Sequence, residues 1–258
     1  MILKYKGIDV YYEDEGQGKV IVLLHGFLEN STMWKELIPQ FSKSNRVITI
    51  DLLGHCESGC LGYVHTMEMM AESLKAVLDY LKVENATFIG HSMGGYVALA
   101  FAELFPEMMN GLCLMNSTAS ADSKERQLNR DRAVAAVKQN HKTFISMSVS
   151  NLFAADNRER LANEIEQVKK EALKMPLQGI IAALEGMKIR KDRTRLVHDA
   201  TYKKMMIIGK KDPVLEYDTL IIQANAANVA IVEFADGHMS HIENKRELPY
   251  IILQFIEK

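Results

Sequence analysis

Short apolar runs alternate along this chain with longer segments in which apolar residues recur every three or four positions. Most of the runs are nearly continuous in apolar residues, which is typical of parallel strands covered on both faces. The predicted strands are Lys19–Leu24, Arg46–Ile50, Ala86–Ile89, Leu112–Met115, Met205–Ile208 and Ala230–Phe234.

The N-terminus has a different pattern, because Ile2–Lys6 and Asp9–Glu13 alternate apolar with polar residues and meet at Gly7. This pattern predicts an antiparallel hairpin at the edge of the sheet. Helical periodicity between and after the runs predicts helices over Glu68–Lys82, Ser92–Phe105, Leu215–Ala226 and Glu247–Glu257. Strands alternating with helices predict an α/β fold with a doubly wound, mostly parallel sheet.

Residues 117–195 interrupt this alternation and show only amphipathic helical patterns. One predicted helix places Leu161, Ile165, Val168 and Ala172 on one stripe, with Asn157 as its N-cap. Pro176 suits the first turn of the next helix. We therefore expect a core formed by residues 1–116 and 196–258, and a helical cap inserted at 117–195.

Composition narrows the class of protein. The chain has 258 residues, a net charge of −2 and 48% hydrophobic residues, so neither nucleic acid nor an anionic membrane is an expected partner. It has no apolar run of about 20 residues and its start does not resemble a signal peptide, which favours a cytoplasmic protein. The sequence carries no pattern that indicates an oligomeric state.

The cysteines and histidines do not predict a metal or a cofactor. The odd count of three cysteines argues against a disulfide scaffold, and Cys113 lies in an apolar run typical of core. Cys56 and Cys60 share one loop as a possible metal or redox pair, but their spacing is not that of a zinc site. The histidines form no i, i+4 pair on a predicted helix.

The stretch GHSMGG at residues 90–95 lies between a predicted strand and a predicted helix. G-x-S-x-G in this context is the pattern of a nucleophile elbow, in which a sharp turn presents the serine at the carboxyl end of a sheet. Gly90 and Gly94 would leave room for neighbouring strands, and Ser92 would be the nucleophile. The alternative is a glycine-rich turn whose serine only caps the helix.

A nucleophilic serine needs a base, and His238 follows the last predicted strand, where this fold supplies one. His241, three residues later, is the local alternative, and we expect it to pack behind. His91 should face away from Ser92, since neighbouring side chains diverge. The remaining histidines are predicted to be solvated or loop residues: His55, His65, His141 and His198.

The base needs an orienting carboxylate, for which Asp212 is the favoured candidate. It follows the predicted strand Met205–Ile208, and Pro213 biases it toward an extended conformation. Asp51 is one alternative, and Asp236 is another, although Asp236-Gly237 has the composition of a turn.

An oxyanion formed at Ser92 needs backbone N–H donors. Met93 follows the nucleophile and can provide one of them. Phe27 can provide the other, because His25-Gly26-Phe27 follows the strand Lys19–Leu24 and Gly26 permits close approach of the backbone.

In this order, HGF (25–27), DLLGHCES (51–58), GHSMGG (90–95), GKKDPV (209–214) and GHMSHIE (237–243) resemble the α/β-hydrolase superfamily across the whole chain. The insertion resembles that family's cap, and its end is similar to the 3-oxoadipate enol-lactonase and carboxylesterase branch. Cys56 departs from the family pattern, which often has glycine there, and we expect this to alter only the shape of the loop.

The resemblance implies a serine hydrolase that cleaves a small carboxylic ester or lactone through an acyl-enzyme. A C–C bond hydrolase, a thioesterase, a lyase or a small-ligand receptor on the same triad remains an alternative. Serine at the elbow argues against haloalkane dehalogenases and epoxide hydrolases, which use aspartate there. Apolar cap residues could line an acyl pocket or form the cap's own core: Phe144, Met147, Leu152, Phe153, Met175 and Met187. Trp34 is expected to pack.

Overall fold

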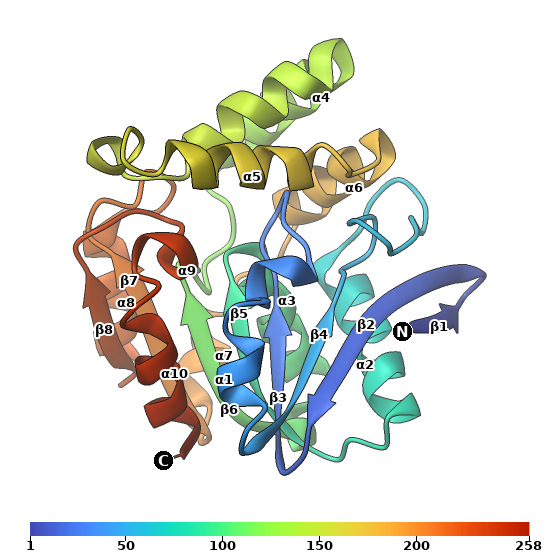
Figure 1. Ribbon diagram of the computed structural model, residues 1–258, viewed down its shortest axis with the longest axis vertical. Helices are drawn as coiled ribbons and strands as arrows, with labels where there is room; N and C mark the ends of the chain where they lie inside the picture. Colours follow the sequence, from blue (N-terminus) through green and yellow to red (C-terminus); the bar gives the residue numbers. More distant parts are fainter. Residues whose placement is uncertain (258) are drawn as a thin grey trace.

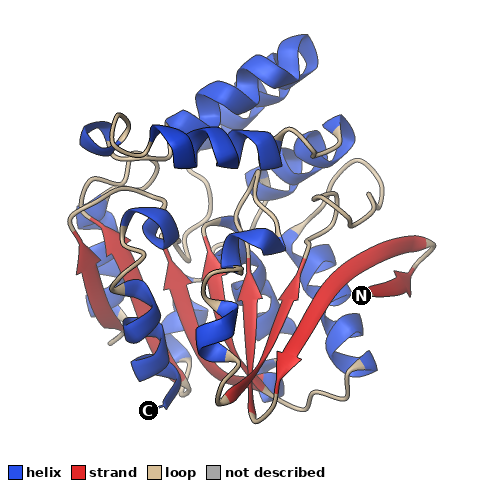
Figure 2. Ribbon diagram, viewed as in Figure 1, coloured by secondary structure: helices blue, strands red, loops and turns tan. Residues whose placement is uncertain are grey.

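A computed structural model describes residues 1–257 and shows one eight-stranded sheet in the order β1-β2-β4-β3-β5-β6-β7-β8 (Figures 1 and 2). Pairing is antiparallel between β1 and β2 and between β2 and β4, and parallel from β4 to β8. The strands are β1 (Ile2–Tyr5), β2 (Ile8–Gly16), β3 (Lys19–Leu24), β4 (Asn45–Ile50), β5 (Ala86–His91), β6 (Met109–Met115), β7 (Lys203–Gly209) and β8 (Ala230–Phe234). The predicted fold class and the edge hairpin are confirmed.

The central strands are apolar on both faces because each face is covered by helices. In β3, Val22 and Leu24 pack into one buried cluster and Ile21 and Leu23 into a second, and all four side chains are inaccessible to solvent. Burial on both faces accounts for the continuous apolar run, since alternation would leave polar side chains inside the protein.

The helices fall into two layers around the sheet. The first layer contains α2 (Met67–Tyr80), α3 (Met93–Leu104) and α8 (Tyr217–Ala226). The second contains η1 (Ser31–Trp34), α1 (Ile38–Phe41) and α10 (Leu248–Glu257), with Trp34 fully buried among them as predicted. The short helices η2 (Pro106–Met108), α7 (Thr194–Asp199) and α9 (Ser240–Glu243) complete the core connections. None of the helices within residues 1–257 is long and apolar enough to cross a membrane.

The segment between β6 and β7 carries α4 (Lys124–Ser150), η3 (Ala155–Asn157), α5 (Ala162–Ala172) and α6 (Leu177–Lys188). These helices lie across the end of the sheet toward which the parallel strands point (Figure 1). The run α4 is interrupted at Asn140, whose φ of −157° and ψ of 90° are not helical. The helical insertion is therefore placed over the edge where loops of parallel strands converge.

One local prediction in this segment is wrong. Asn157 does not cap the following helix, which begins at Ala162 after Leu161 and has no side-chain cap. The Asn157 amide instead donates to Asp236 and Glu243, at 2.8 Å each. Its side chain thus joins the insertion to the core, a long-range role that local capping patterns do not reveal.

Candidate active site

Ser92 occupies a strained turn between β5 and α3. Its φ of 49° and ψ of −114° lie outside the conformations that serine readily adopts, and its side chain makes no capping hydrogen bond to the helix. The turn is held by its backbone instead, because the Ser92 N–H donates to Met115 O at 2.9 Å and the Ser117 hydroxyl donates to Ser92 O at 2.7 Å. The helix-cap alternative is therefore not what the structure shows.

The two elbow glycines sit where a side chain would meet backbone. A Cβ on Gly94 would lie 2.6 Å from the carbonyl carbon of Leu24, at the end of β3. A Cβ on Gly90 would lie 2.5 Å from backbone atoms of Gly94 and Gly95. The clash at Gly94 is with a neighbouring strand, as predicted, whereas Gly90 makes room for the elbow's own helix.

Asp212 and His238 are brought together by the loops after β7 and β8. His238 Nδ1 lies 2.7 Å from Asp212 Oδ2, and both side chains are almost completely buried. The other carboxylate oxygen, Oδ1, accepts the N–H groups of Val214 and Leu215 at 2.8 and 3.0 Å. Burial alone would raise the pKa of Asp212, but the neighbouring His238 outweighs it, so the pKa lies below its usual value. Asp212 is thus an ionised group in a fixed orientation.

Asn116 is a residue of this site that the sequence analysis missed. Its amide donates to Asp212 Oδ2 at 3.2 Å and to Gly237 O at 3.1 Å, and its oxygen accepts the Ser240 hydroxyl at 2.6 Å. The absence of an acid after β6 was visible in the sequence, but the amide that stands there was not assigned a role. Asn116 joins Asp212 to the loop that carries His238.

The loop after β3 places Phe27 beside the elbow. Within residues 1–257, neither the Phe27 N–H nor the Met93 N–H donates to another protein group, so both donors remain available. His25 fixes the loop, since its Nε2 accepts Leu52 N–H at 2.9 Å and its Nδ1 therefore carries the proton donated to Gly26 O at 2.8 Å. Phe27 and Met93 thus each keep a backbone donor that is not used by the described residues.

Glu29 forms a second support for the same loop. Its Oε2 accepts the Gly26 N–H at 2.7 Å and lies 2.6 Å from His91 Nδ1. His91 Nε2 in turn lies 2.9 Å from the backbone oxygen of His238. His91 lines the same cavity as Ser92, but both of its ring nitrogens are engaged, and its ring links the loop after β3 to the loop after β8.

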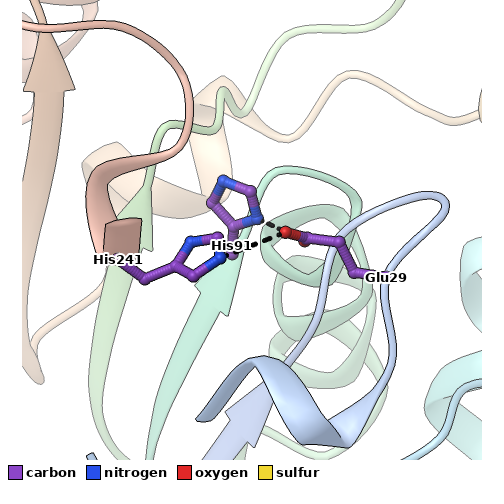
Figure 3. A group of neighbouring side chains, drawn as sticks. All are labelled: Glu29, His91 and His241. Atoms are coloured by element: carbon purple, nitrogen blue, oxygen red, sulfur yellow. Dashed lines mark hydrogen bonds and ion pairs between the residues drawn. The ribbon is translucent and has the colours of Figure 1, made fainter. Parts of the chain in front are cut away.

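His91, Glu29 and His241 also form a buried group with possible metal-binding atoms within 4.8 Å of one another (Figure 3). The two imidazoles point toward the Glu29 carboxylate, with His241 Nε2 3.6 Å from Oε1. Both nitrogens of His91 already make short contacts to oxygen, so a metal would have to break the pair with Glu29. The contacts fit a structural hydrogen-bond network better than a metal centre.

The alternative acids are used elsewhere. Asp51 accepts the N–H groups of Ser31 and Glu57, and Asp236 accepts the amides of Asn157 and Asn244. Neither contacts a histidine through these bonds. The structure therefore pairs His238 with Asp212 alone among the three acids that were considered.

The surroundings of two other histidines correct the sequence analysis. His55 and His65 were predicted to be solvated or loop residues, yet both are inaccessible to solvent. His55 Nδ1 contacts Leu53 O, and His65 Nε2 accepts Leu61 N–H at 3.0 Å. Both lie in loops, as predicted, but these loops are folded under the insertion, where burial lowers the pKa of each imidazole.

Ser92 and His238 open into one cavity of about 90 Å³. Its other lining residues are Phe27, Leu28, His91, Tyr96, Arg130, Ser148, Leu152, Met187 and Val214. Among the described residues, the only side chain bonded to Ser92 is that of Ser117, which contacts the Ser92 carbonyl, so the Ser92 hydroxyl makes no hydrogen bond. A larger cleft of about 580 Å³ lies between α5 and the η1–α1 segment and shares only Leu28 with this cavity.

Of the apolar cap residues considered for an acyl pocket, Leu152 and Met187 line the cavity at Ser92. Phe153 and Met175 are buried in the core cluster, and Met147 is 62% exposed. Most of these residues thus pack into an apolar cluster that is continuous with the core of the sheet.

The loop from Asp51 to Ser58 explains one departure from the family pattern. Cys56 has a φ of 45°, in the left-handed region that favours glycine. All three cysteines are free thiols. The cysteine therefore occupies a turn conformation suited to glycine without forming a disulfide.

Comparison with known proteins identifies the family to which this chain belongs. A thermophilic esterase from Thermogutta terrifontis, solved with malate bound, superposes with a TM-score of 0.92 at 28% identity, covering 100% of this chain and 97% of that one. The enol-lactonase from Burkholderia xenovorans LB400 gives a TM-score of 0.91 at 22% identity, covering 100% of both chains, and shows the same fold. An uncharacterized protein of Mycobacterium bovis is 35% identical over 102 residues, which is 40% of this chain but 30% of that protein. The α/β hydrolase fold model matches residues 19–245, and the chain belongs to the α/β hydrolase family.

Proposed function

We propose that the protein is a serine hydrolase that cleaves a short carboxylic ester or lactone through an acyl-enzyme on Ser92. One observation carries the proposal. Ser92 has a strained backbone, its side chain does not cap the helix, and it opens into the same cavity as His238, whose Nδ1 pairs with the buried Asp212. Residues 117–195 would be the cap over this site. The likeness to an esterase at 28% identity over the whole chain supports ester chemistry.

The proposed reaction uses only groups that this chain provides. His238 Nε2 takes the hydroxyl proton as Ser92 Oγ attacks the carbonyl carbon, and the oxyanion accepts the N–H groups of Phe27 and Met93. The intermediate collapses when His238 returns the proton to the leaving alcohol oxygen. Water then attacks the acyl carbon as His238 takes its proton, and His238 returns that proton to Ser92 Oγ as the acyl–oxygen bond breaks and the acid leaves. Asp212 keeps the proton on Nδ1 and stabilises the imidazolium.

The size of the cavity favours a short acyl group. About 90 Å³ is well below the roughly 300–1,000 Å³ of typical ligand pockets. A long acyl chain would require movement of Leu28 or of the cap helices. We therefore expect acetate and other short esters to be turned over faster than octanoate esters.

The proposal is tested by p-nitrophenyl acetate turnover and by labelling with a fluorophosphonate probe. The wild-type protein should turn over many molecules of p-nitrophenyl acetate and bind one fluorophosphonate label per chain, and Ser92→Ala should lose both the turnover and the labelling. Ser148→Ala is the matched comparison, because Ser148 is the other serine of the cavity. Labelling that persists in Ser92→Ala but disappears in Ser148→Ala would place the nucleophile on the cap and refute the assignment.

A further inference from the structure

Arg130, which lines the cavity at Ser92, belongs to a cluster of three arginines around one buried carboxylate. Asp122, whose side chain is fully buried, contacts the Nε atoms of Arg126 and Arg130 at 3.1 and 3.0 Å and Arg190 Nη1 at 2.5 Å. Three guanidinium groups therefore surround one carboxylate. Burial would raise the pKa of Asp122, but the arginines outweigh it and hold the pKa below its usual value. The nearby Asp192 accepts the N–H groups of Ala121 and Thr194.

Two of these arginines are held by further contacts within the protein. Arg126 Nη1 donates to Val214 O at 2.9 Å. Arg190 donates to Met187 O and Ser120 O, and its guanidinium lies over the Tyr96 ring at 4.1 Å from the centroid. Their positions are therefore fixed by internal contacts, and neither of them lines the cavity at Ser92, although Arg190 Nε has no acceptor among the described residues.

Arg130 differs from both. Its Nε is bonded to Asp122, but among residues 1–257 its two terminal nitrogens have no acceptor, and its side chain is 18% exposed. It lines the cavity that holds Ser92 and His238, as does Ser148. Arg130 is thus a half-buried guanidinium with a free fork of N–H donors in the proposed acyl site.

We propose that Arg130 is the anchor for a carboxylate on the substrate, so that the preferred substrates are short esters or lactones that carry a free carboxylate. This proposal rests on the proposed hydrolase function. Arginine presents two parallel N–H groups that match the two oxygens of a carboxylate, and partial burial strengthens such bonds. Three arginines around Asp122 outnumber the nearby carboxylates, Asp122 and Asp192, which favours an anion at Arg130, and the Ser148 hydroxyl offers a further donor in the same cavity. The small cavity limits the anion to a short chain.

Two esters of equal length test this specificity. Monomethyl glutarate and methyl pentanoate differ in that a carboxylate replaces the terminal methyl group, and their hydrolysis can be followed by acid release in a pH-stat. We expect wild-type kcat/KM to be at least 10-fold higher for monomethyl glutarate. Arg130→Gln should lower kcat/KM for monomethyl glutarate by about 10- to 100-fold, mainly through KM, because a charged hydrogen-bond pair is lost. It should change kcat/KM for methyl pentanoate less than threefold.

The controls separate charge, geometry and folding. Arg132→Gln removes the same charge from an exposed position on the same helix and should leave both substrates unchanged. Arg130→Lys keeps the charge but loses the fork, and should fall between wild type and Arg130→Gln. Asp122 retains Arg126 and Arg190 in these variants, and thermal unfolding will verify that the fold is intact.

Each outcome bears on one proposal. If wild type hydrolyses neither ester, and p-nitrophenyl acetate is not turned over either, the hydrolase function is wrong. If methyl pentanoate is hydrolysed and monomethyl glutarate is not preferred, or if Arg130→Gln affects both equally, the carboxylate anchor is wrong while the hydrolase stands.

Discussion

Replacing Glu29 by glutamine tests how much the buried Glu29–His91 pair contributes to the stability of the protein. His91 contacts two acceptors, Glu29 Oε2 at Nδ1 and the His238 carbonyl at Nε2, at 2.6 and 2.9 Å. An imidazole can donate at both nitrogens only when it is protonated. Burial would lower the pKa of His91, but the Glu29 charge outweighs it and raises the pKa. The pair is therefore a buried carboxylate and imidazolium.

The structure gives the size of the expected effect. Burial alone would raise the pKa of Glu29, but His91 outweighs it and lowers the pKa from 4.5 to about 2. At about 1.4 kcal/mol per pKa unit, ionised Glu29 contributes on the order of 3 kcal/mol to the free energy of unfolding. A glutamine side chain at this position could still accept the Gly26 N–H, but His91 would then be an unpaired buried cation or would lose one bond. We expect Glu29→Gln to destabilise the protein by roughly 3 kcal/mol at pH 6.

The effect should depend on pH in a defined direction. The pKa of Glu29 is lowered on folding, so its contribution is present above about pH 4.5 and is lost as pH falls toward 2. The pKa of His91 is raised, so its contribution is present below about pH 6.5 and is lost as pH rises through the folded pKa. The difference between wild type and variant should thus be largest between about pH 4.5 and 6.5 and should shrink toward pH 9.

Urea unfolding at pH 6 and pH 9 provides the assay, with Glu36→Gln as the matched control. Glu36 is an exposed glutamate of the following segment, and its replacement should change stability by less than about 0.5 kcal/mol at both pH values. A Glu29→Gln protein as stable as wild type at pH 6 would refute the reasoning, as would a destabilisation that does not change between pH 6 and pH 9.

Three further substitutions or reactions have outcomes that the same geometry defines. Asp212→Asn should lower kcat about 10³- to 10⁴-fold. The two backbone donors on Oδ1 would turn the new NH₂ group toward His238 Nδ1, so the imidazole proton would move to Nε2, the nitrogen that must accept the serine proton. Asp218→Asn is the exposed control. Gly90→Ala should unfold at a lower temperature than Gly62→Ala, because a Cβ at Gly90 meets backbone at 2.5 Å, whereas an alanine at Gly62 meets nothing within 4 Å and is strained only by its φ of +82°; equal midpoints in thermal scans would contradict this. Burial raises the pKa of Cys56 to about 11 and also raises the pKa of Cys113. A thiol reagent at pH 8 should therefore modify Cys56 slowly and Cys113 only after unfolding, as measured by absorbance with and without urea. Rapid labelling of Cys113 in the native protein would show that the buried core around it opens.

The sequence predicts the fold well because the relevant information is local. The central parallel strands are buried on both faces and are therefore nearly continuous apolar runs, and the elbow is a short pattern with a strand before it and a helix after it. Asp212 and His238 could be proposed for the same reason, since each follows its own strand and parallel strands end at one edge of the sheet.

The contacts that support these residues could not be predicted in this way. Glu29 and His91 are 62 positions apart, and Asn116 and Asp212 are 96 apart, so no periodicity relates them. His55 and His65 lie in polar loops that look solvated until the insertion covers them. The side chain of Asn157 is drawn away from local capping by Asp236 and Glu243, which become neighbours only after folding.

The segment Leu152–Asn157 joins the proposed cap to the loop of the proposed base. Leu152 O accepts the His238 N–H at 3.0 Å, and Ala154 N–H donates to Glu243 Oε1 at 3.0 Å. His238 is therefore held at three points: its N–H by the insertion, its carbonyl by His91 and its ring by Asp212. Because one of these points belongs to the insertion, a change in this segment that shifts the cap also shifts the imidazole. Substitutions in this segment should thus change kcat together with KM, whereas substitution of Arg130, in α4, should act mainly on KM.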